Sequence, residues 1–132
     1  MKSLEKKYTE QRQYLERAVS RLGEVLAMEH DAAHTVRDSA IQRFEFCFDL
    51  SWKTMKTYLQ VRHGIACASP KTCLREAAGV GLLRENHDSF WLTMLEMRNL
   101  TSHTYNEQFA DDLYSQLQDT HTHFLSLLKV LD

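Results

Sequence analysis

Apolar side chains recur every three or four residues along most of the chain, which is the spacing of one face of an amphipathic helix. The first stripe predicts a helix over residues 3–29 and consists of Leu4, Tyr8, Leu15, Val19, Leu22 and Leu26. The second predicts a helix that is capped at its start by Thr35 or Asp38 and ends near His63, with Gly64 as its C-terminal cap. Its apolar members are Ile41, Phe44, Phe48, Trp52, Met55 and Leu59. A last stripe predicts a helix over residues 109–131 and consists of Leu113, Leu117, Phe124, Leu128 and Leu131.

A short helix and a strongly apolar helix are predicted between the second and the last stripe. Ser69 followed by Pro70 is typical of a helix start, and this helix should end around Gly79 or Gly81. A further helix, capped by Asp88 or Ser89, contains residues 90–97, which leave it almost no polar face. A helix that is apolar nearly all round is buried on more than one side. In a chain this small, we expect the second side to pack against another copy, which predicts a homodimer.

Composition agrees with an all-α fold. One proline and four glycines are too few for a many-stranded β fold, and the length of 132 residues predicts a single domain over residues 1–132. We therefore expect an antiparallel up-and-down four-helix bundle with an additional short helix. No apolar run approaches the roughly 20 residues of a membrane span, and the first residues do not resemble a signal peptide. The expected location is the cytoplasm, without membrane contact.

The cysteines and the charges point to no cofactor. Cys47, Cys67 and Cys73 form no C-x-x-C motif, so buried thiols are favoured, with a disulfide between Cys67 and Cys73 as the alternative. His121 and His123 would point apart on a helix, so no metal site is expected. The net charge is −2, although Lys and Arg outnumber Asp and Glu over residues 1–21 and 37–62. Solvated faces explain this distribution most simply, and a basic face for RNA is the alternative.

Residues with the chemistry of phosphodiester cleavage follow the apolar run. Arg98 offers a permanent forked cation, His103 contributes an imidazole, the side-chain type that most readily exchanges protons near neutral pH, and Tyr105 adds a hydroxyl. On a straight helix Arg98 and Tyr105 lie about 20° apart, but Arg98 and His103 lie about 140° apart. The pair therefore converges only if the helix ends or distorts between them, or if a second chain completes the site. The alternative is an ordinary helix end, where the helix dipole favours cations.

The spacing Arg98-x4-His103-x-Tyr105 resembles the motif of HEPN-domain proteins, in particular HepT-like toxins. Residues 38–46 and 49–56 are similar to a signature of the nucleotidyltransferase substrate-binding protein family, a branch of the HEPN superfamily. Residues 98–107 resemble the other signature of that family. The likeness covers roughly residues 4–130, in order.

The resemblance implies a homodimeric helical bundle that pairs with a minimal nucleotidyltransferase. It implies a metal-independent endoribonuclease in which Arg98 holds the scissile phosphate of the RNA and His103 acts as general base or acid. Tyr105 matches the tyrosine that the partner adenylylates to silence the toxin. Asn99, Ser102 and Glu45 are supporting candidates. The alternative is a non-catalytic subunit that presents substrate to the nucleotidyltransferase.

Glu45 also has a purely local interpretation. Glu45, Asp49 and Lys53 follow one another in steps of four residues, which is typical of a salt-bridged, exposed row on a helix. In the family interpretation, Glu45 instead approaches the site at the dimer interface.

Overall fold

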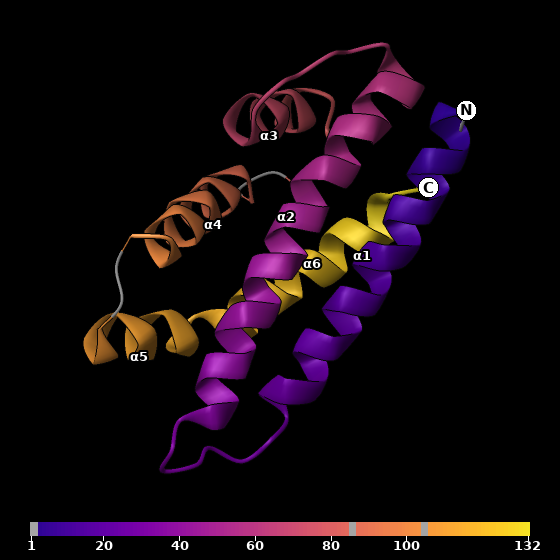
Figure 1. Cartoon of the computed structure of the whole chain (residues 1–132). Coiled ribbons are helices and arrows are strands. Elements are labelled where there is room, and N and C mark those ends of the chain that lie inside the picture. Colours follow the sequence, from indigo (N-terminus) through magenta and orange to yellow (C-terminus); the bar gives the residue numbers. More distant parts are fainter. Residues whose placement is uncertain (1–2, 85–86, 104–105) are drawn as a thin grey trace.

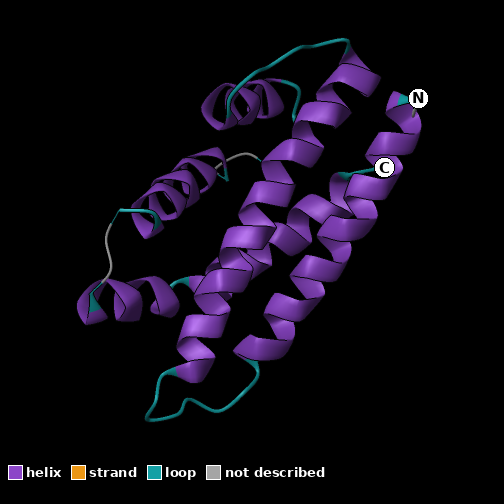
Figure 2. Ribbon diagram, viewed as in Figure 1, coloured by secondary structure: helices purple, strands orange, loops and turns teal. Residues whose placement is uncertain are grey.

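The computed structural model describes residues 3–84, 87–103 and 106–132, and these form helices joined by short loops with no strand among them (Figures 1 and 2). In chain order the helices are α1 (Leu4–Leu26), α2 (Thr35–His63), α3 (Pro70–Gly79), α4 (Asp88–Thr101), α5 (Glu107–Ser115) and α6 (Leu117–Val130). The predicted all-α bundle is confirmed. None of the described helices is long and apolar enough to cross a membrane.

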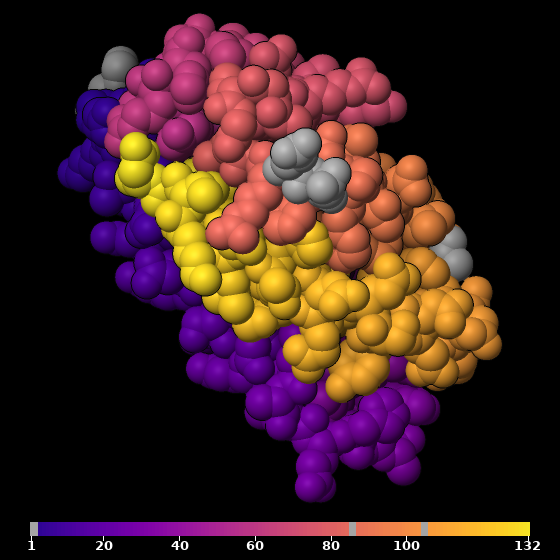
Figure 3. Space-filling model, turned by 180° about the vertical axis from the view of Figure 1, so that it is seen from behind, coloured from indigo at the N-terminus to yellow at the C-terminus, as the bar shows by residue number. Residues whose placement is uncertain are grey.

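The long helix α2 is the centre of the fold and contacts each of the other five. α1 runs antiparallel along one side of it, and α3, α4 and α5 follow one another along the other side (Figure 1). From behind, α6 lies across the bundle beside α1 (Figure 3). The chain therefore places α4 and α5, which flank the candidate motif, against the same helix.

Aromatic side chains from three helices form the centre of the core. The Trp91 ring of α4 lies 6.3 Å from that of Phe48 on α2 and 5.6 Å from that of Phe124 on α6, measured between centroids. All three side chains are almost completely buried. Such rings contribute large apolar areas and favour tilted or edge-to-face packing. This cluster fixes the position of α4 relative to α2.

The second apolar side of α4 packs partly within the chain itself. Phe90 stacks on the ring of His123 of α6 at 4.1 Å, and Leu92 lines a small cavity together with Leu74 of α3. Phe90, Leu92 and Leu95 are half-buried and pack against the core. A second subunit is thus not needed to explain the composition of this helix, and the homodimer stays a prediction.

The helix ends agree only in part with the predicted caps. Ser69 caps α3 with Pro70 in its first turn, and Gly64, at φ 66°, ends α2 as predicted. The start of α2 differs, because the Asp31 carboxylate accepts hydrogen bonds from the backbone N–H groups of Thr35 and Val36. Asp31 thus replaces the predicted cap, Thr35 or Asp38.

Two further predictions about helix boundaries are wrong. Asp88 is the first residue of α4 and does not cap it, and neither does Ser89, which lies inside the helix. The predicted last helix is divided at Gln116 into α5 and α6. Leu113 and Leu117 are both buried on either side of this break, so the apolar stripe continues through it.

Two of the three cysteines form a disulfide, so the favoured prediction of buried free thiols is wrong for them and the alternative holds. Cys67, in the loop before α3, forms a disulfide with Cys73 in the first turns of α3, with a Cα–Cα distance of 5.3 Å. The loop after Gly64 folds back toward α3, which brings the two residues together. Cys47 is a free, buried thiol, and its burial raises its pKa to about 12.

Candidate functional site

Arg98 lies in the last turn of α4 and is held by carboxylates of α2. Its Nε and Nη2 atoms donate to the two oxygens of Asp49 at 3.1 and 3.0 Å, and Nη1 donates to the Thr101 hydroxyl at 3.0 Å. Glu45 lies 3.5 Å from Nη1. The hydrogen bonds to Asp49 raise the pKa of Arg98 further above its ordinary value. A two-pronged bond of this kind fixes the plane of the guanidinium as well as its position.

Glu45 and Asp49 therefore have a role across helices. The predicted local row with Lys53 is wrong for these two carboxylates, since both face the guanidinium of α4. Their side chains are 29% and 38% exposed, against 23% for Arg98. The ion pair is thus partly shielded from water, so it stabilises the fold more than a fully exposed pair would.

His103 lies just beyond the end of α4. The helix ends at Thr101, Ser102 follows as its C-terminal cap, and the His103 backbone N–H donates to the Leu100 carbonyl. The helix thus ends between Arg98 and His103, which is one of the two arrangements that the sequence left open, and completion of the site by a second chain stays a prediction. The His103 side chain is exposed, so it is accessible to a polymeric substrate.

Of the other candidate residues, two lie apart from the ion pair and one is outside the residues that the structure describes. Asn99 and Ser102 are exposed at the end of α4 and take no part in the bonds that hold Arg98. Tyr105 lies outside the described residues. The structure thus joins Arg98 with Glu45 and adds Asp49 and Thr101, which sequence reasoning did not assign to the site.

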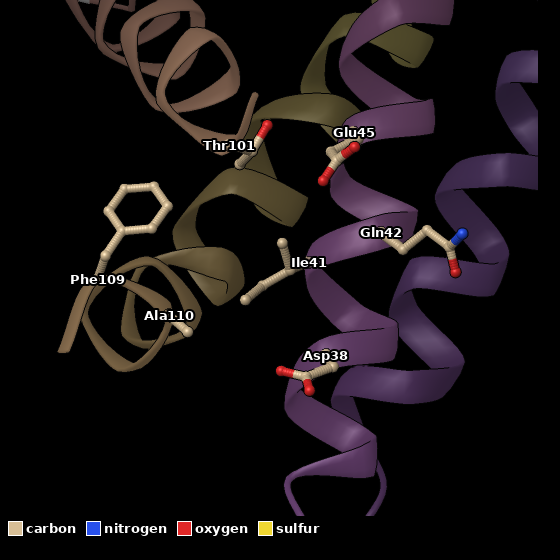
Figure 4. Close-up of a pocket in the computed structure, with 7 residues that line it drawn as sticks. All are labelled: Asp38, Ile41, Gln42, Glu45, Thr101, Phe109 and Ala110. Atoms are coloured by element: carbon tan, nitrogen blue, oxygen red, sulfur yellow. The ribbon is translucent and has the colours of Figure 1, made fainter. Parts of the chain in front are cut away.

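A cavity of about 330 Å³ lies beside this cluster, between α2, the end of α4 and α5 (Figure 4). It shares Glu45 and Thr101 with the surroundings of Arg98. The remaining lining residues are Asp38, Ile41, Gln42, Phe109 and Ala110. A space of this size lies at the small end of the ligand-pocket range of about 300–1,000 Å³.

A second arginine fixes the far wall of the cavity. Arg37 on α2 is only 1% exposed, and its Nη1 donates to Glu107 at 2.7 Å and to Asp111 at 2.9 Å, both on α5. Its Nε donates to Asp38 at 3.0 Å. These bonds raise the pKa of Arg37 and lower that of Glu107, the hydrogen bond between the two being the largest cause in each case. The only sequence signal for this contact was the four-residue step from Glu107 to Asp111.

The described side chains contain no group of three or more His, Cys, Asp or Glu residues arranged to hold a metal ion. His121 serves a different purpose, since its Nε2 lies 3.2 Å from the Val19 carbonyl of α1. His123 stacks on Phe90 and lies 4.5 Å from the ring of His87. Burial lowers the pKa of His87, with a smaller contribution from His123. His121 and His123 thus each contact another helix of the bundle.

Residues 10–132 match the model of the family described as nucleotidyltransferase substrate binding protein like. The chain belongs to this family. Its resemblance to the nucleotidyltransferase substrate-binding proteins is thereby confirmed, and the matched residues include α2 and the motif that begins in the last turn of α4.

One curated protein and two solved structures are similar to this member of the nucleotidyltransferase substrate-binding family. A Haemophilus influenzae protein named "Probable ribonuclease HepT" is 40% identical over 89 residues, which are 64% of this chain and 60% of that protein. The aligned part thus spans less than two thirds of that relative. A crystal structure from Thermus thermophilus has a TM-score of 0.82 and 39% identity, over 89% of this chain and 98% of that one. A Haemophilus influenzae structure described as a substrate binding domain of a nucleotidyltransferase has a TM-score of 0.67 and 32% identity, over 98% of both chains.

Proposed function

We propose that the chain is a HepT-like endoribonuclease, the toxin of a pair with a minimal nucleotidyltransferase. It cleaves RNA without a metal ion through Arg98 and His103, and the partner neutralises it by adenylylating Tyr105. The family and the name of the HepT relative support this proposal. The observation that carries it is an oriented guanidinium in the last turn of α4, five residues before an exposed imidazole.

The arrangement suits cleavage of a phosphodiester by the neighbouring ribose hydroxyl. The 2′-oxygen attacks phosphorus, the bond to the 5′-oxygen breaks, and the products are a 2′,3′-cyclic phosphate and a 5′-hydroxyl. His103 takes the proton from the 2′-hydroxyl or gives one to the leaving oxygen. Two copies of the chain would supply one imidazole for each transfer, which is why we retain the homodimer in the proposal.

Arg98 has hydrogen-bonding capacity left for the phosphate. A guanidinium carries five N–H groups, and three of those on Arg98 are used by Asp49 and Thr101. The remaining groups can donate to a non-bridging oxygen and stabilise the charge that develops on it. Asp49 acts as a positioning residue, because it holds the guanidinium without touching the substrate.

Cleavage by the purified protein in the presence of EDTA tests this proposal. We expect Arg98→Ala to lower the cleavage rate by roughly 10²–10³-fold, as loss of an oxyanion donor does in other enzymes. Arg98→Lys should also be impaired, since an ammonium cannot reproduce the two-pronged bond to Asp49. Arg84→Ala, at an exposed arginine on the loop before α4, is the matched control. Circular dichroism checks that each variant is folded, and equal rates for wild type and both Arg98 variants would refute the proposed chemistry.

Modification of Tyr105 is tested separately. After incubation with the partner nucleotidyltransferase and ATP, the intact mass should rise by whole adenylyl units, and RNA cleavage should fall in parallel. Tyr105→Phe should show neither change, whereas Tyr14→Phe, at an exposed tyrosine of α1, should behave as wild type. A full mass rise in Tyr105→Phe would place the modification on another residue.

The second candidate function is a non-catalytic subunit that presents substrate to the nucleotidyltransferase. It is favoured by the Haemophilus influenzae structure, which is described as a substrate binding domain, and by the carboxylates that already bind Arg98. On this alternative the protein binds its partner, and neither wild type nor variants cleave RNA or arrest growth. Growth arrest by wild type that is lost in Arg98→Ala would exclude it.

A further inference from the structure

The cavity beside Arg98 has apolar walls and an acidic rim. Ile41 and Ala110 form part of its wall, with the Phe109 ring on α5 across from Ile41 on α2 (Figure 4). Its polar lining consists of Asp38, Gln42, Glu45 and Thr101, and neither lysine nor arginine is among its lining residues. The lining therefore suits a largely apolar group with hydrogen-bond donors on its edge, and it offers no cation of its own to a phosphate.

The carboxylates of the rim differ in their availability. Asp38 accepts from Arg37 Nε at 3.0 Å, which uses one of its oxygens. Glu45 lies at 3.5 Å from Arg98, beyond the length of a good charge-assisted hydrogen bond. An ionised carboxylate only accepts hydrogen bonds, and it has about four lone-pair positions. Glu45 is thus the acceptor best placed to bind a donor that enters the cavity.

The cavity and the candidate cleavage site adjoin each other. Glu45 and Thr101 line the cavity and also contact the guanidinium of Arg98. A nucleotide placed here meets two environments, an apolar slot with acceptors for its base and a cation with spare N–H groups for its phosphate. Unstacked RNA bases are commonly recognised by such a combination of aromatic stacking and hydrogen bonds to their edges.

We propose that this cavity is a nucleobase subsite that selects cytosine, through its exocyclic amino group, over uracil. Phe109 stacks on the base and Glu45 accepts from the amino group. Uracil is disfavoured because its O4 carbonyl would face the carboxylate. The proposal rests on RNA being the substrate of the proposed function. It adds which nucleotide of the RNA is bound next to Arg98.

Binding of matched oligonucleotides tests the subsite without requiring cleavage. Fluorescein-labelled tetranucleotides of cytidine and of uridine differ at the base edge but hardly in size. Fluorescence anisotropy with the His103→Ala protein keeps the RNA intact during the measurement. We expect the cytidine tetramer to bind about tenfold more tightly, in the range of discrimination by a good base contact. Equal affinities for the two tetramers would overturn the proposal.

Variants separate recognition from a merely structural effect. Glu45→Gln replaces two acceptors by an acceptor and a donor, so the preference should vanish or turn toward uridine. Loss of structure alone would lower both affinities and leave their ratio unchanged, which would contradict the assignment. Phe109→Ala should weaken both tetramers by a similar factor. Glu16→Gln, at an exposed carboxylate of α1, is the matched control and should retain the ratio.

The outcome also distinguishes this proposal from the proposed function. If RNA is cleaved but cytidine and uridine tetramers bind equally, the subsite fails and the ribonuclease stands. If cytidine is preferred but no RNA is cleaved, the subsite stands and the chain is the presenting subunit. If neither tetramer binds and the wild type does not cleave RNA, both proposals fail.

Discussion

Replacing His103 with alanine is expected to slow RNA cleavage by about 10²–10⁴-fold, the usual contribution of a general acid or base. The free energy of unfolding should stay close to that of the wild type, because the side chain lies exposed beyond the end of α4. Substitutions at such surface positions usually change stability by less than about 0.5 kcal/mol. Single-turnover cleavage with labelled RNA gives the rate, and urea denaturation gives the stability.

The pH dependence adds a second measure of the same prediction. The wild-type rate should depend on pH, because a general acid or base acts in only one of its protonation states. The residual rate of His103→Ala should lose that dependence. His63→Ala, at an exposed histidine on the last turn of α2, is the matched control and should keep both the rate and its pH profile. A His103→Ala protein with an unchanged profile would assign the proton transfer to another group.

Trp91→Ala is expected to lower the free energy of unfolding by about 3–5 kcal/mol, as large-to-small substitutions of buried aromatic residues do. Trp91 is 1% exposed, and its ring contacts those of Phe48 and Phe124. Loss of the indole ring would leave a cavity and remove the contacts that hold α4 against α2 and α6. Urea denaturation followed by circular dichroism measures the loss.

Trp52→Ala is the matched control for this second prediction, since the chain has two tryptophans and Trp52 is only half-buried on α2. Its cost should be clearly smaller. A cost for Trp52→Ala equal to that of Trp91→Ala would mean that the aromatic cluster around α4 is not the main stabilising contact. Since α4 carries Arg98, we also expect Trp91→Ala to lose cleavage at lower temperature than the wild type.

The fold was predictable because apolar spacing determines which side of each helix is buried. The break at Gln116 was not, since Leu113 and Leu117 are four residues apart and keep the stripe in phase across it. Spacing reports the burial of side chains, whereas a kink is a matter of backbone geometry. The cap by Asp31 escaped for a related reason, because it depends on how the loop before α2 turns back.

The site was predictable as a motif but not as an arrangement. The helix geometry left two arrangements open, an end of the helix between Arg98 and His103 or a second chain, and α4 does end between them. Glu45 was among the candidates, but Asp49 was missed as a partner of Arg98, because a four-residue step between charges is equally typical of a local row and of a face turned toward another helix. Only the packing of α4 on α2 decides between the two. Tyr105, which lies outside the described residues, stays a prediction from the family motif.

Arg98 and Arg37 together tie two successive helices to one element. Arg98 fastens the end of α4 to Asp49, and Arg37 fastens the start of α5 to α2. These two anchor points are twelve residues apart on α2, which is about 18 Å along a helix axis. Because both anchors lie on the same helix, α2 sets the spacing between α4 and α5. A substitution of Arg37 would therefore release α5 and alter the candidate site even though Arg98 and His103 were retained.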